Sequence, residues 1–378
     1  MVRLMPSKCR SAWRAVPAPA RRVTALAAAA LAVSAAAPGV APVPWKKSFE
    51  SISARTNFLE SVTAPGRRDG WAVGLHYHGQ APIRRPYVLH WNGTVWRPVA
   101  LPTAGPLVTV NVVASSPANV WVFGNLNGVS DAAEAVRWDG ARWHVIRIPA
   151  AGSSDDPVVL GPSDAWILGG ETVCPAAGPC DTVLHWDGSR WHPYVLPTLV
   201  GGELAGGISG SGPDNVWAVG SDPASGGIAR IVAFRWNGKA WRSVRMPHPR
   251  IPIGGTPVID VAGRRNVWIV AILAHTAPGH SYIHALHWDG RSWHMISPPV
   301  SARASFPIIA DGGHGLWFGV RAHWTGHRWV SPVQGTPFNA DFTEFAQIPG
   351  TSTIWAVGLV PRANIAESLI QYNGTLPK

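Results

Sequence analysis

The sequence is poor in cysteine and in charged residues. Three cysteines in 378 residues exclude a framework of several disulfides and a zinc site built from four thiolates. Charged residues are only 14% of the chain, so enough apolar material remains for a large core. The apolar run at residues 23–37 is about 15 residues long, shorter than the ~20 that a membrane-spanning helix needs.

Much of the net charge of +11 lies at the N-terminus. Residues 1–40 carry six basic residues and no acidic ones, and the rest of the chain has 26 basic against 21 acidic residues. This balance is too modest to indicate a nucleic-acid partner. A basic segment, an apolar run and small residues near Ala35, Ala37 or Ala41 are typical of an export signal. We therefore expect residues 1–41 to be a signal peptide and the mature protein to be secreted without a membrane anchor; Arg21-Arg22 leaves Sec and Tat export both open.

Only two of the three cysteines lie outside the expected signal peptide, which we also call the leader. Cys9 falls in the leader, and the mature chain keeps Cys174 and Cys180 in Cys-Pro-Ala-Ala-Gly-Pro-Cys. An isolated pair in an exported protein is most simply a local disulfide. Two thiols without a nearby histidine make a poor metal site. No other group of converging ligands stands out in the sequence, and we expect no metal and no cofactor.

A phrase with two tryptophans recurs along nearly the whole chain. The copy at residues 183–197 has two β-like runs joined across Asp187-Gly188, a pair that tolerates the positive φ of a tight hairpin. In the first six copies a second Trp follows five residues after the first. The first aromatic residues of the copies are Trp91, Trp138, Trp186, Trp236, Trp288, Trp324 and Tyr372.

A second phrase, a Trp within an apolar run, precedes each copy. Its tryptophans are Trp71, Trp121, Trp166, Trp217, Trp268, Trp317 and Trp355. They are spaced by 50, 45, 51, 51, 49 and 38 residues, with room for four short strands in each unit. We name the four strands of a unit a, b, c and d in chain order. Strand a is the first apolar stretch, and strand b contains the Trp of the apolar run. Strand c ends at the Trp-Asp-Gly hairpin, and strand d follows that hairpin. The pattern predicts an all-β fold, a seven-bladed β-propeller of four-stranded antiparallel blades.

The two ends of the repeat complement each other. The seventh unit ends after strand c and lacks the Trp of strand d, while Trp45 starts a d-like run with no unit before it. We predict that this N-terminal strand completes the last blade and closes the ring, which makes residues 42–378 one propeller domain. We expect this domain to be a monomer.

Turn and packing positions also repeat. A glycine stands five residues before the strand b Trp in six of the seven units, which predicts a turn with positive φ between a and b. Asp or Asn often stands two residues before that Trp, and we interpret these residues as formers of local backbone turns. The residue before the strand c aromatic alternates between His, Arg and Gln, as at His90, Arg137 and Gln371, and is interpreted as packing between blades.

The repeat resembles a known family. Residues 120–124, followed by Val136-Arg137-Trp138-Asp139-Gly140-Ala141-Arg142-Trp143 and Ile148-Pro149, resemble the kelch repeat and similar secreted bacterial propellers of the galactose oxidase type. The resemblance covers about residues 43–374. Only Gly169-Gly170 preserves the glycine pair of that repeat, and the turn between c and d is shorter. The resemblance implies a seven-bladed propeller and no single activity.

The tryptophans repeat in every blade, so we assign them to blade packing and look for binding residues among those that differ. The loops between b and c vary most, and in a propeller they share one face with the loops between d and a. The densest polar and aromatic groups lie in the first and fifth of these loops. They are His76, Tyr77 and His78, and His280, Tyr282 and His284. We interpret them as candidates for contact with an extracellular glycan or protein.

Catalytic residues are harder to find. Glu60 and Glu344 occupy the same place in their units, on strands expected to be neighbours, and Asp260 and Asp311 also lie on strand a. Two carboxylates across a cleft would suit a hydrolase or lyase acting on glycans, whereas carboxylates that line the channel need have no catalytic role. The sequence favours a non-catalytic binding scaffold and leaves the glycan-active enzyme as the alternative.

Overall fold

The computed structural model describes most of the repeat region. The described residues are 45–51, 57–77, 84–102, 107–126, 133–149, 156–169, 172–174, 178–180, 182–197, 206–224, 228–247, 256–274, 281–299, 307–319, 322–330, 341–362 and 365–377. All of them belong to one unit, Pro42–Lys378. They form strands joined by turns, and no helix long and apolar enough to cross a membrane occurs among them.

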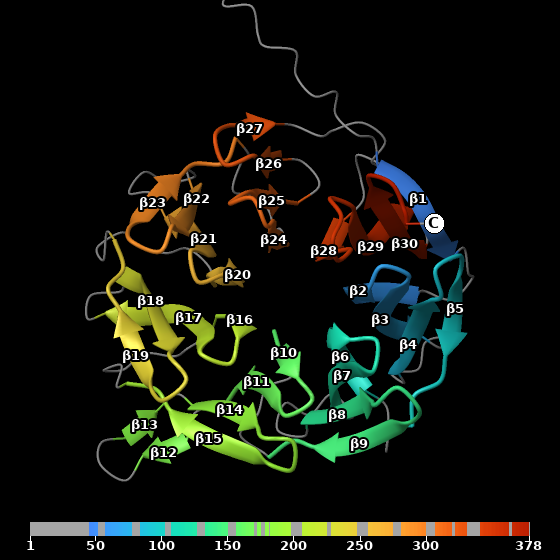
Figure 1. Cartoon of the computed structure of the whole chain (residues 1–378), viewed down its shortest axis with the longest axis horizontal. Helices are drawn as coiled ribbons and strands as arrows, with labels where there is room; N and C mark the ends of the chain where they lie inside the picture. The colour runs from blue at the N-terminus through green and yellow to red at the C-terminus, as the bar shows by residue number, and fades with distance from the viewer. Residues whose placement is uncertain are drawn as a thin grey trace, which may run out of the picture. The chain divides into compact units, whose positions relative to one another are not determined.

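Seven four-stranded antiparallel sheets, the blades, make up this unit and are arranged radially (Figure 1). Blade 1 contains β2 (Asn57–Gly66), β3 (Asp69–Tyr77), β4 (Arg84–Trp91) and β5 (Trp96–Val99). Blade 2 contains β6 (Leu107–Ser116), β7 (Asn119–Leu126), β8 (Ala133–Trp138) and β9 (Trp143–Arg147). Blade 3 contains β10 (Val158–Gly161), β11 (Asp164–Leu168), β14 (Thr182–Trp186) and β15 (Trp191–Val195).

The remaining blades follow the same plan. Blade 4 contains β16 (Ile208–Gly212), β17 (Asn215–Ala224), β18 (Ile228–Trp236) and β19 (Trp241–Val244). Blade 5 contains β20 (Val258–Gly263), β21 (Asn266–Ala274), β22 (Ser281–Trp288) and β23 (Trp293–Ile296). Blade 6 contains β24 (Ile308–Ala310), β25 (Leu316–Phe318), β26 (Ala322–Trp324) and β27 (Trp329–Val330). Blade 7 contains β28 (Asp341–Gln347), β29 (Ile354–Arg362), β30 (Ile365–Asn373) and β1 (Trp45–Ser51).

Blade 7 confirms the predicted closure. Strand β1 pairs antiparallel with β30, with Trp45 opposite Asn373 and Ser51 opposite Ser368. Figure 1 shows blue β1 beside red β30. The innermost strand of each blade contacts that of the next, and β28 of blade 7 contacts β2 of blade 1. The N-terminal strand therefore supplies the outer strand that blade 7 would otherwise lack.

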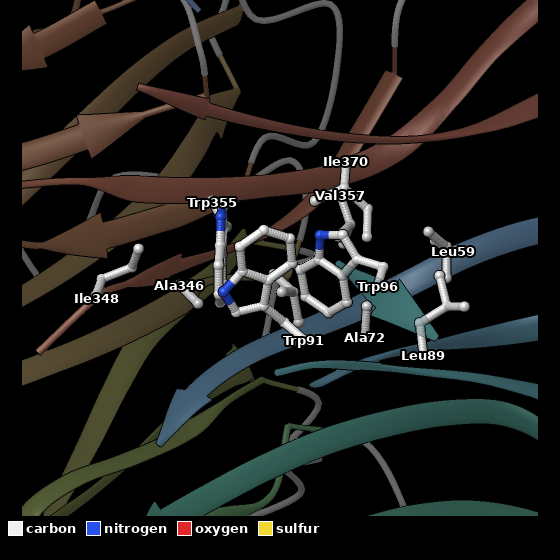
Figure 2. Packing of buried hydrophobic residues seen from close by; sticks show 11 residues of the cluster. Leu59, Ala72, Leu89, Trp91, Trp96, Ala346, Ile348, Trp355, Val357 and Ile370 are labelled. Carbon is white, nitrogen blue, oxygen red and sulfur yellow. The ribbon is translucent and has the colours of Figure 1, made fainter. Parts of the chain in front are cut away.

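Neighbouring blades are joined by tryptophans. The strand b Trp of one blade packs against the strand c and strand d tryptophans of the next: the Trp355 ring centroid lies 5.9 Å from that of Trp91 and 5.0 Å from that of Trp96 (Figure 2). The same contact closes the ring between blades 6 and 7, where Trp317 meets Trp45 edge-on at 6.1 Å. Each buried Trp removes about 150–250 Å² from water, roughly 4–6 kcal/mol of gross stabilisation. The packing role expected for the tryptophans is thus confirmed.

The turn glycines are only partly as predicted. Glycines of the hairpins between c and d have positive φ, for example 99° at Gly188, as the Asp-Gly pairs indicated. The prediction was wrong for most glycines between a and b, because among them only Gly350 has positive φ, at 68°. Gly66, Gly161, Gly212 and Gly263 instead pair across the turn with the first residue of strand b, next to a shift in strand register. This turn needs no left-handed residue at that position.

The Asp or Asn before each strand b Trp does more than form a turn. Asn266 is buried, and its Oδ1 accepts hydrogen bonds from Trp268 Nε1 at 2.9 Å and from His287 Nε2 at 3.1 Å. The His287 ring also stacks on Trp268 of its own blade, with centroids 4.3 Å apart. His90 stacks likewise on Trp71, and Arg137 lies over the Trp121 ring at 5.6 Å, each within its own blade. These residues therefore stack within a blade, which corrects the expectation of packing between blades.

Candidate functional site

Two of the predicted ligand-binding histidines are described, on different blades. His76 lies on β3, opposite Arg85, and its ring centroid is 5.9 Å from that of Tyr87. His284 lies on β22, opposite Ala271. The backbones of Tyr77 and Tyr282 continue the same strands, but their side chains, like all of His78 and His280, lie outside the described residues. The predicted contact of these residues with a ligand stays a prediction.

The predicted disulfide is also untested. The loop between b and c of blade 3 contains two short paired strands, β12 (Thr172–Cys174) and β13 (Gly178–Cys180). Their register places Thr172 opposite Cys180 and Cys174 opposite Gly178. The thiols themselves lie outside the described side chains, so the bond between Cys174 and Cys180 stays a prediction.

The acidic residues of the inner strands connect neighbouring blades. Glu344 Oε2 on β28 accepts a hydrogen bond from Val62 N of blade 1, at 3.1 Å. Glu60 Oε2 on β2 accepts one from Val110 N of blade 2, at 3.0 Å. Since the inner edge of each sheet has backbone N–H groups that no further strand pairs, these carboxyl groups satisfy donors that would otherwise lack a protein acceptor.

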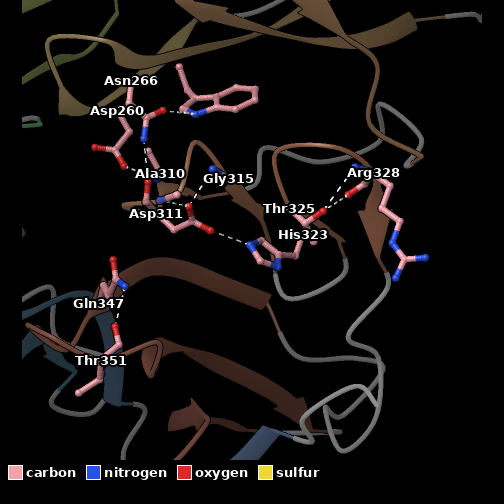
Figure 3. A network of polar contacts seen from close by, with 12 residues as sticks. Asp260, Asn266, Ala310, Asp311, Gly315, His323, Thr325, Arg328, Gln347 and Thr351 are labelled. Atoms are coloured by element: carbon pink, nitrogen blue, oxygen red, sulfur yellow. Dashed lines mark hydrogen bonds and ion pairs between the residues drawn. The ribbon is translucent and has the colours of Figure 1, made fainter. Parts of the chain in front are cut away.

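Asp260 repeats this arrangement in blade 5. Its Oδ2 accepts a hydrogen bond from Ala310 N of blade 6, at 2.6 Å (Figure 3). Serine hydroxyls do the same elsewhere: Ser61 Oγ accepts from Val112 N at 2.9 Å, and Ser209 Oγ accepts from Val261 N at 3.1 Å. Acidic and hydroxyl side chains on strand a thus link consecutive blades around the channel.

Asp311, the fourth acidic residue that the sequence placed on strand a, has a different role. Its Oδ1 accepts hydrogen bonds from Gly313 N and Gly315 N at 2.8 and 2.7 Å, and its Oδ2 lies 2.9 Å from His323 Nε2 (Figure 3). Asp311 therefore shapes the turn between β24 and β25. Its place just beyond the end of β24 explains the difference.

The carboxyl groups of Asp260 and Glu344 line one cavity in the channel. This cavity has a volume of about 430 Å³ and lies between strands β2, β6, β20, β24 and β28. Burial, together with the nearby charges of Asp156 and Asp260, raises the pKa of Glu344 to about 8, although hydrogen bonds from Ser61 and Val62 N act in the opposite direction. Burial also raises the pKa of Asp260. At neutral pH Glu344 is therefore mostly protonated.

The outer hairpins contain a polar unit that varies between blades. In Asp187-Gly188-Ser189-Arg190-Trp191-His192, Asp187 Oδ1 accepts from Ser189 N and Arg190 N at 2.7 and 2.9 Å, and Oδ2 lies 2.6 Å from His192 Nε2. The bonds from Arg190 N and His192 hold the pKa of Asp187 below its usual range. Blades 2 and 5 have the same Asp and His, whereas blades 1 and 4 have Asn with Arg. The pairing stabilises a turn and brings no third ligand, and no cluster able to hold a metal ion occurs among the described residues.

Comparisons with known proteins identify the fold of this chain and no function. No protein-family model and no curated protein matches the chain. Among solved structures, the β-propeller domain of the Trilobed protease from Pyrococcus furiosus, described as having an open velcro topology, is similar with TM-score 0.55, 10% identity and coverage of 86% of this chain and 95% of that one. A PL25 ulvan lyase gives TM-score 0.51, 11% identity and coverage of 85% and 96%.

A puromycin-hydrolyzing peptidase of Mycobacterium tuberculosis gives TM-score 0.53 and 13% identity over 88% of this chain and 54% of that one. Identities this low show a shared fold alone. Together with the sheet order and the pairing of β1 with β30, they place this chain among the β-propellers, with seven four-stranded blades and a ring closed by its N-terminal strand.

Proposed function

We propose that this protein is an exported, non-catalytic β-propeller that binds a glycan or protein partner through the loops on one face. The observation that carries the proposal is the use of the inner carboxyl groups: Glu60, Asp260 and Glu344 each accept a backbone hydrogen bond from the next blade. A catalytic carboxyl group has to reach substrate and exchange protons. These carboxyl groups are instead held as links between blades.

The proposed binding face is the one with the loops between b and c. His76 and His284 stand beside the first and fifth of these loops, and their identities differ from those at corresponding places in other blades. Residues that repeat in every blade are accounted for by packing, whereas these are not. We further propose that the protein is a kelch-like propeller, secreted through Sec or Tat, active as a monomer and without a cofactor.

One observation favours the alternative, an extracellular hydrolase or lyase that acts on glycans. Glu344, with a pKa of about 8, shares the channel cavity with Asp260. A carboxyl group that stays protonated near neutral pH suits a general acid. In this alternative Glu344 would donate the proton, and Asp260 or Glu60 would supply the second carboxyl group.

Glycan-array binding and a hydrolysis screen on the same glycans separate the two functions. The proposal predicts binding without turnover, and a loss of at least tenfold in affinity for His76→Ala or His284→Ala. His192→Ala, on a hairpin at the opposite face, is the matched control and should bind normally. Turnover of a bound glycan that Glu344→Gln abolishes would instead establish the enzyme and overturn the non-catalytic proposal.

A further inference from the structure

A second cavity, of about 630 Å³, lies between blades 5 and 6 on the face opposite the proposed binding loops. Its walls come from turns between a and b, at Arg265 and His314, from the hairpin between c and d at His327, and from strand β23 at His294. In an antiparallel blade these two kinds of turn lie at the same end of the sheet. We call this cavity the blade 5/6 cleft.

Two of the cleft residues depart from the repeat. His314 and His327 are the only histidines at their positions in any blade. His314 also has φ of 61°, a left-handed conformation that a residue with a side chain seldom adopts. Asp311 Oδ1 holds this turn by accepting from Gly313 N and Gly315 N. The exposed imidazole of His314 lines the cleft.

Several polar side chains of the cleft have donors that no described acceptor uses. Arg265 Nε donates to Asp289 O at 3.1 Å, and its two terminal nitrogens donate to no acceptor in the described part of the chain. His314 and His327 likewise make no hydrogen bond there; His314 contacts the His287 ring edge-on at 5.5 Å. A ligand rich in acceptors would satisfy these groups.

The acidic residue of the cleft is already engaged. Asp289 Oδ1 accepts from Arg291 N and Ser292 N at 2.7 and 2.8 Å, and Oδ2 lies 2.9 Å from His294 Nε2. Burial lowers the pKa of His287 to about 4, so this ring is neutral at pH 7. Among the described residues, Asp289 is the one carboxylate that lines the cleft, and its oxygens already accept other bonds, so the terminal nitrogens of Arg265 can still donate to an anionic group.

The other wall of the cleft is apolar. Trp324 is half-buried and lines it together with Met295, which is 47% exposed, and Ile296. A half-buried indole beside polar donors suits a sugar ring, because the C–H face of a sugar packs on aromatic surface while its oxygens accept hydrogen bonds. A metal ion fits poorly, since no group of three suitable ligands occurs in the described residues.

We propose that the blade 5/6 cleft binds an anionic saccharide unit, a uronic acid or a sulfated sugar. The carboxylate or sulfate lies against Arg265, His314 and His327, and the sugar ring lies on Trp324 and Met295. This site lies on the other face from His76 and His284, and it stands whether or not the loops of blades 1 and 5 bind a ligand.

Calorimetric titration of the full-length protein tests the site with three oligosaccharides: trigalacturonate, which has carboxylates and no sulfate, a carrageenan tetrasaccharide, which has sulfates and no carboxylate, and neutral maltotriose. The proposal predicts binding of at least one anionic oligosaccharide and no measurable binding of maltotriose. The first two probes decide between the carboxylate and the sulfate. Equal binding of neutral and anionic sugars, or binding of none, would overturn the proposal.

Variants locate the site. His314→Gly removes the imidazole and suits the left-handed backbone, so this variant should fold at least as well as the parent and lose at least tenfold in affinity. His327→Ala should lose a similar factor, whereas His144→Ala, at a comparable hairpin of blade 2, should bind as the parent does. Parent-like affinity in both cleft variants would contradict the assignment, and loss of affinity in His76→Ala and His284→Ala alone would place the ligand at the loops instead.

Discussion

Trp45 lies directly opposite Asn373 in an antiparallel strand pair, so the first described residue and the last strand share one sheet. The indole of Trp45 is 3% exposed and contacts Trp317 of blade 6. It thus occupies in blade 7 the place that Trp96 occupies in blade 1. Blade 7 therefore contains both β1 and β30. Opening of the ring at this blade requires the loss of the β1–β30 pairing or of the contact between Trp45 and Trp317.

Trp45→Ala should destabilise the protein by about 3–5 kcal/mol, because it leaves a large cavity between Trp317 and Phe345. Urea denaturation followed by tryptophan fluorescence and by circular dichroism measures the change. Val95→Ala is the matched control: Val95 is 43% exposed, and its truncation should change stability by less than about 0.5 kcal/mol. An equal effect of the two substitutions would contradict the packing role of Trp45.

Glu344→Gln should change the pH dependence of stability. The Glu344 pKa rises from 4.5 in the unfolded chain to about 8 in the folded protein. Between these values the unfolded chain releases a proton that the folded protein keeps, so rising pH removes stability from the parent. The glutamine of the variant keeps the acceptor for Val62 N and cannot ionise. The variant should be more stable than the parent by about 2–4 kcal/mol at pH 8, less than the full pKa shift implies because the side chain is partly exposed, and about equal to it at pH 4.5. Parallel stability curves from pH 4.5 to 8 would contradict the raised pKa of Glu344.

Asp187→Asn should flatten the acid end of the stability curve. The folded protein holds the Asp187 pKa below 3.8, so this carboxylate contributes stability above that pH and loses the contribution as pH falls further. The asparagine retains the acceptor for Ser189 N and Arg190 N, as Asn237 does in blade 4. Melting temperatures from pH 5 to 2 should fall less steeply in the variant than in the parent. Asp187→Ala, which also loses the backbone acceptor, should melt below Asp187→Asn at pH 7; the reverse order would contradict this account of the hairpin.

Asn266→Ala should cost about 2–4 kcal/mol, because it removes an acceptor from Trp268 Nε1 and His287 Nε2 and a donor, Asn266 Nδ2, to Asp311 O of the next blade. Figure 3 shows Asn266 between the two blades. Asn237→Ala, at an exposed hairpin, is the control and should cost no more than about 1 kcal/mol. Chemical denaturation measures both, and a cost for Asn266→Ala no greater than that of the control would rule out the buried network.

The sequence predicted the architecture well because the repeat is dense and periodic. Seven strand b tryptophans set the number of blades, and the missing strand d Trp at one end together with Trp45 at the other indicated closure. The hairpin Asp-Gly pairs predicted positive φ correctly. For glycines between a and b the same reasoning failed, because glycine also occurs beside register shifts, as at Gly263.

The candidate sites were harder to predict because they depend on contacts between blades. Glu60 and Glu344 could be placed on inner strands, but the acceptance of backbone bonds from the next blade follows only from the positions of β6 and β2. The blade 5/6 cleft combines turns about 60 residues apart, from Arg265 to His327. Histidine at positions 314 and 327, where other blades have none, was the available signal.

Closure of the ring is tested most directly by an engineered disulfide between the two ends. Lys46 is opposite Tyr372, and the Lys46 ammonium lies 5.9 Å from the Tyr372 ring centroid, so both side chains are on one face of blade 7. After mild oxidation, peptide mapping of the Lys46→Cys, Tyr372→Cys double variant should find residues 46 and 372 covalently linked, with the melting temperature raised. The Lys47→Cys, Tyr372→Cys variant, whose two positions are on opposite faces, should remain unlinked. Failure of the first pair to link, or equal linking of both pairs, would contradict the closure of blade 7 by β1.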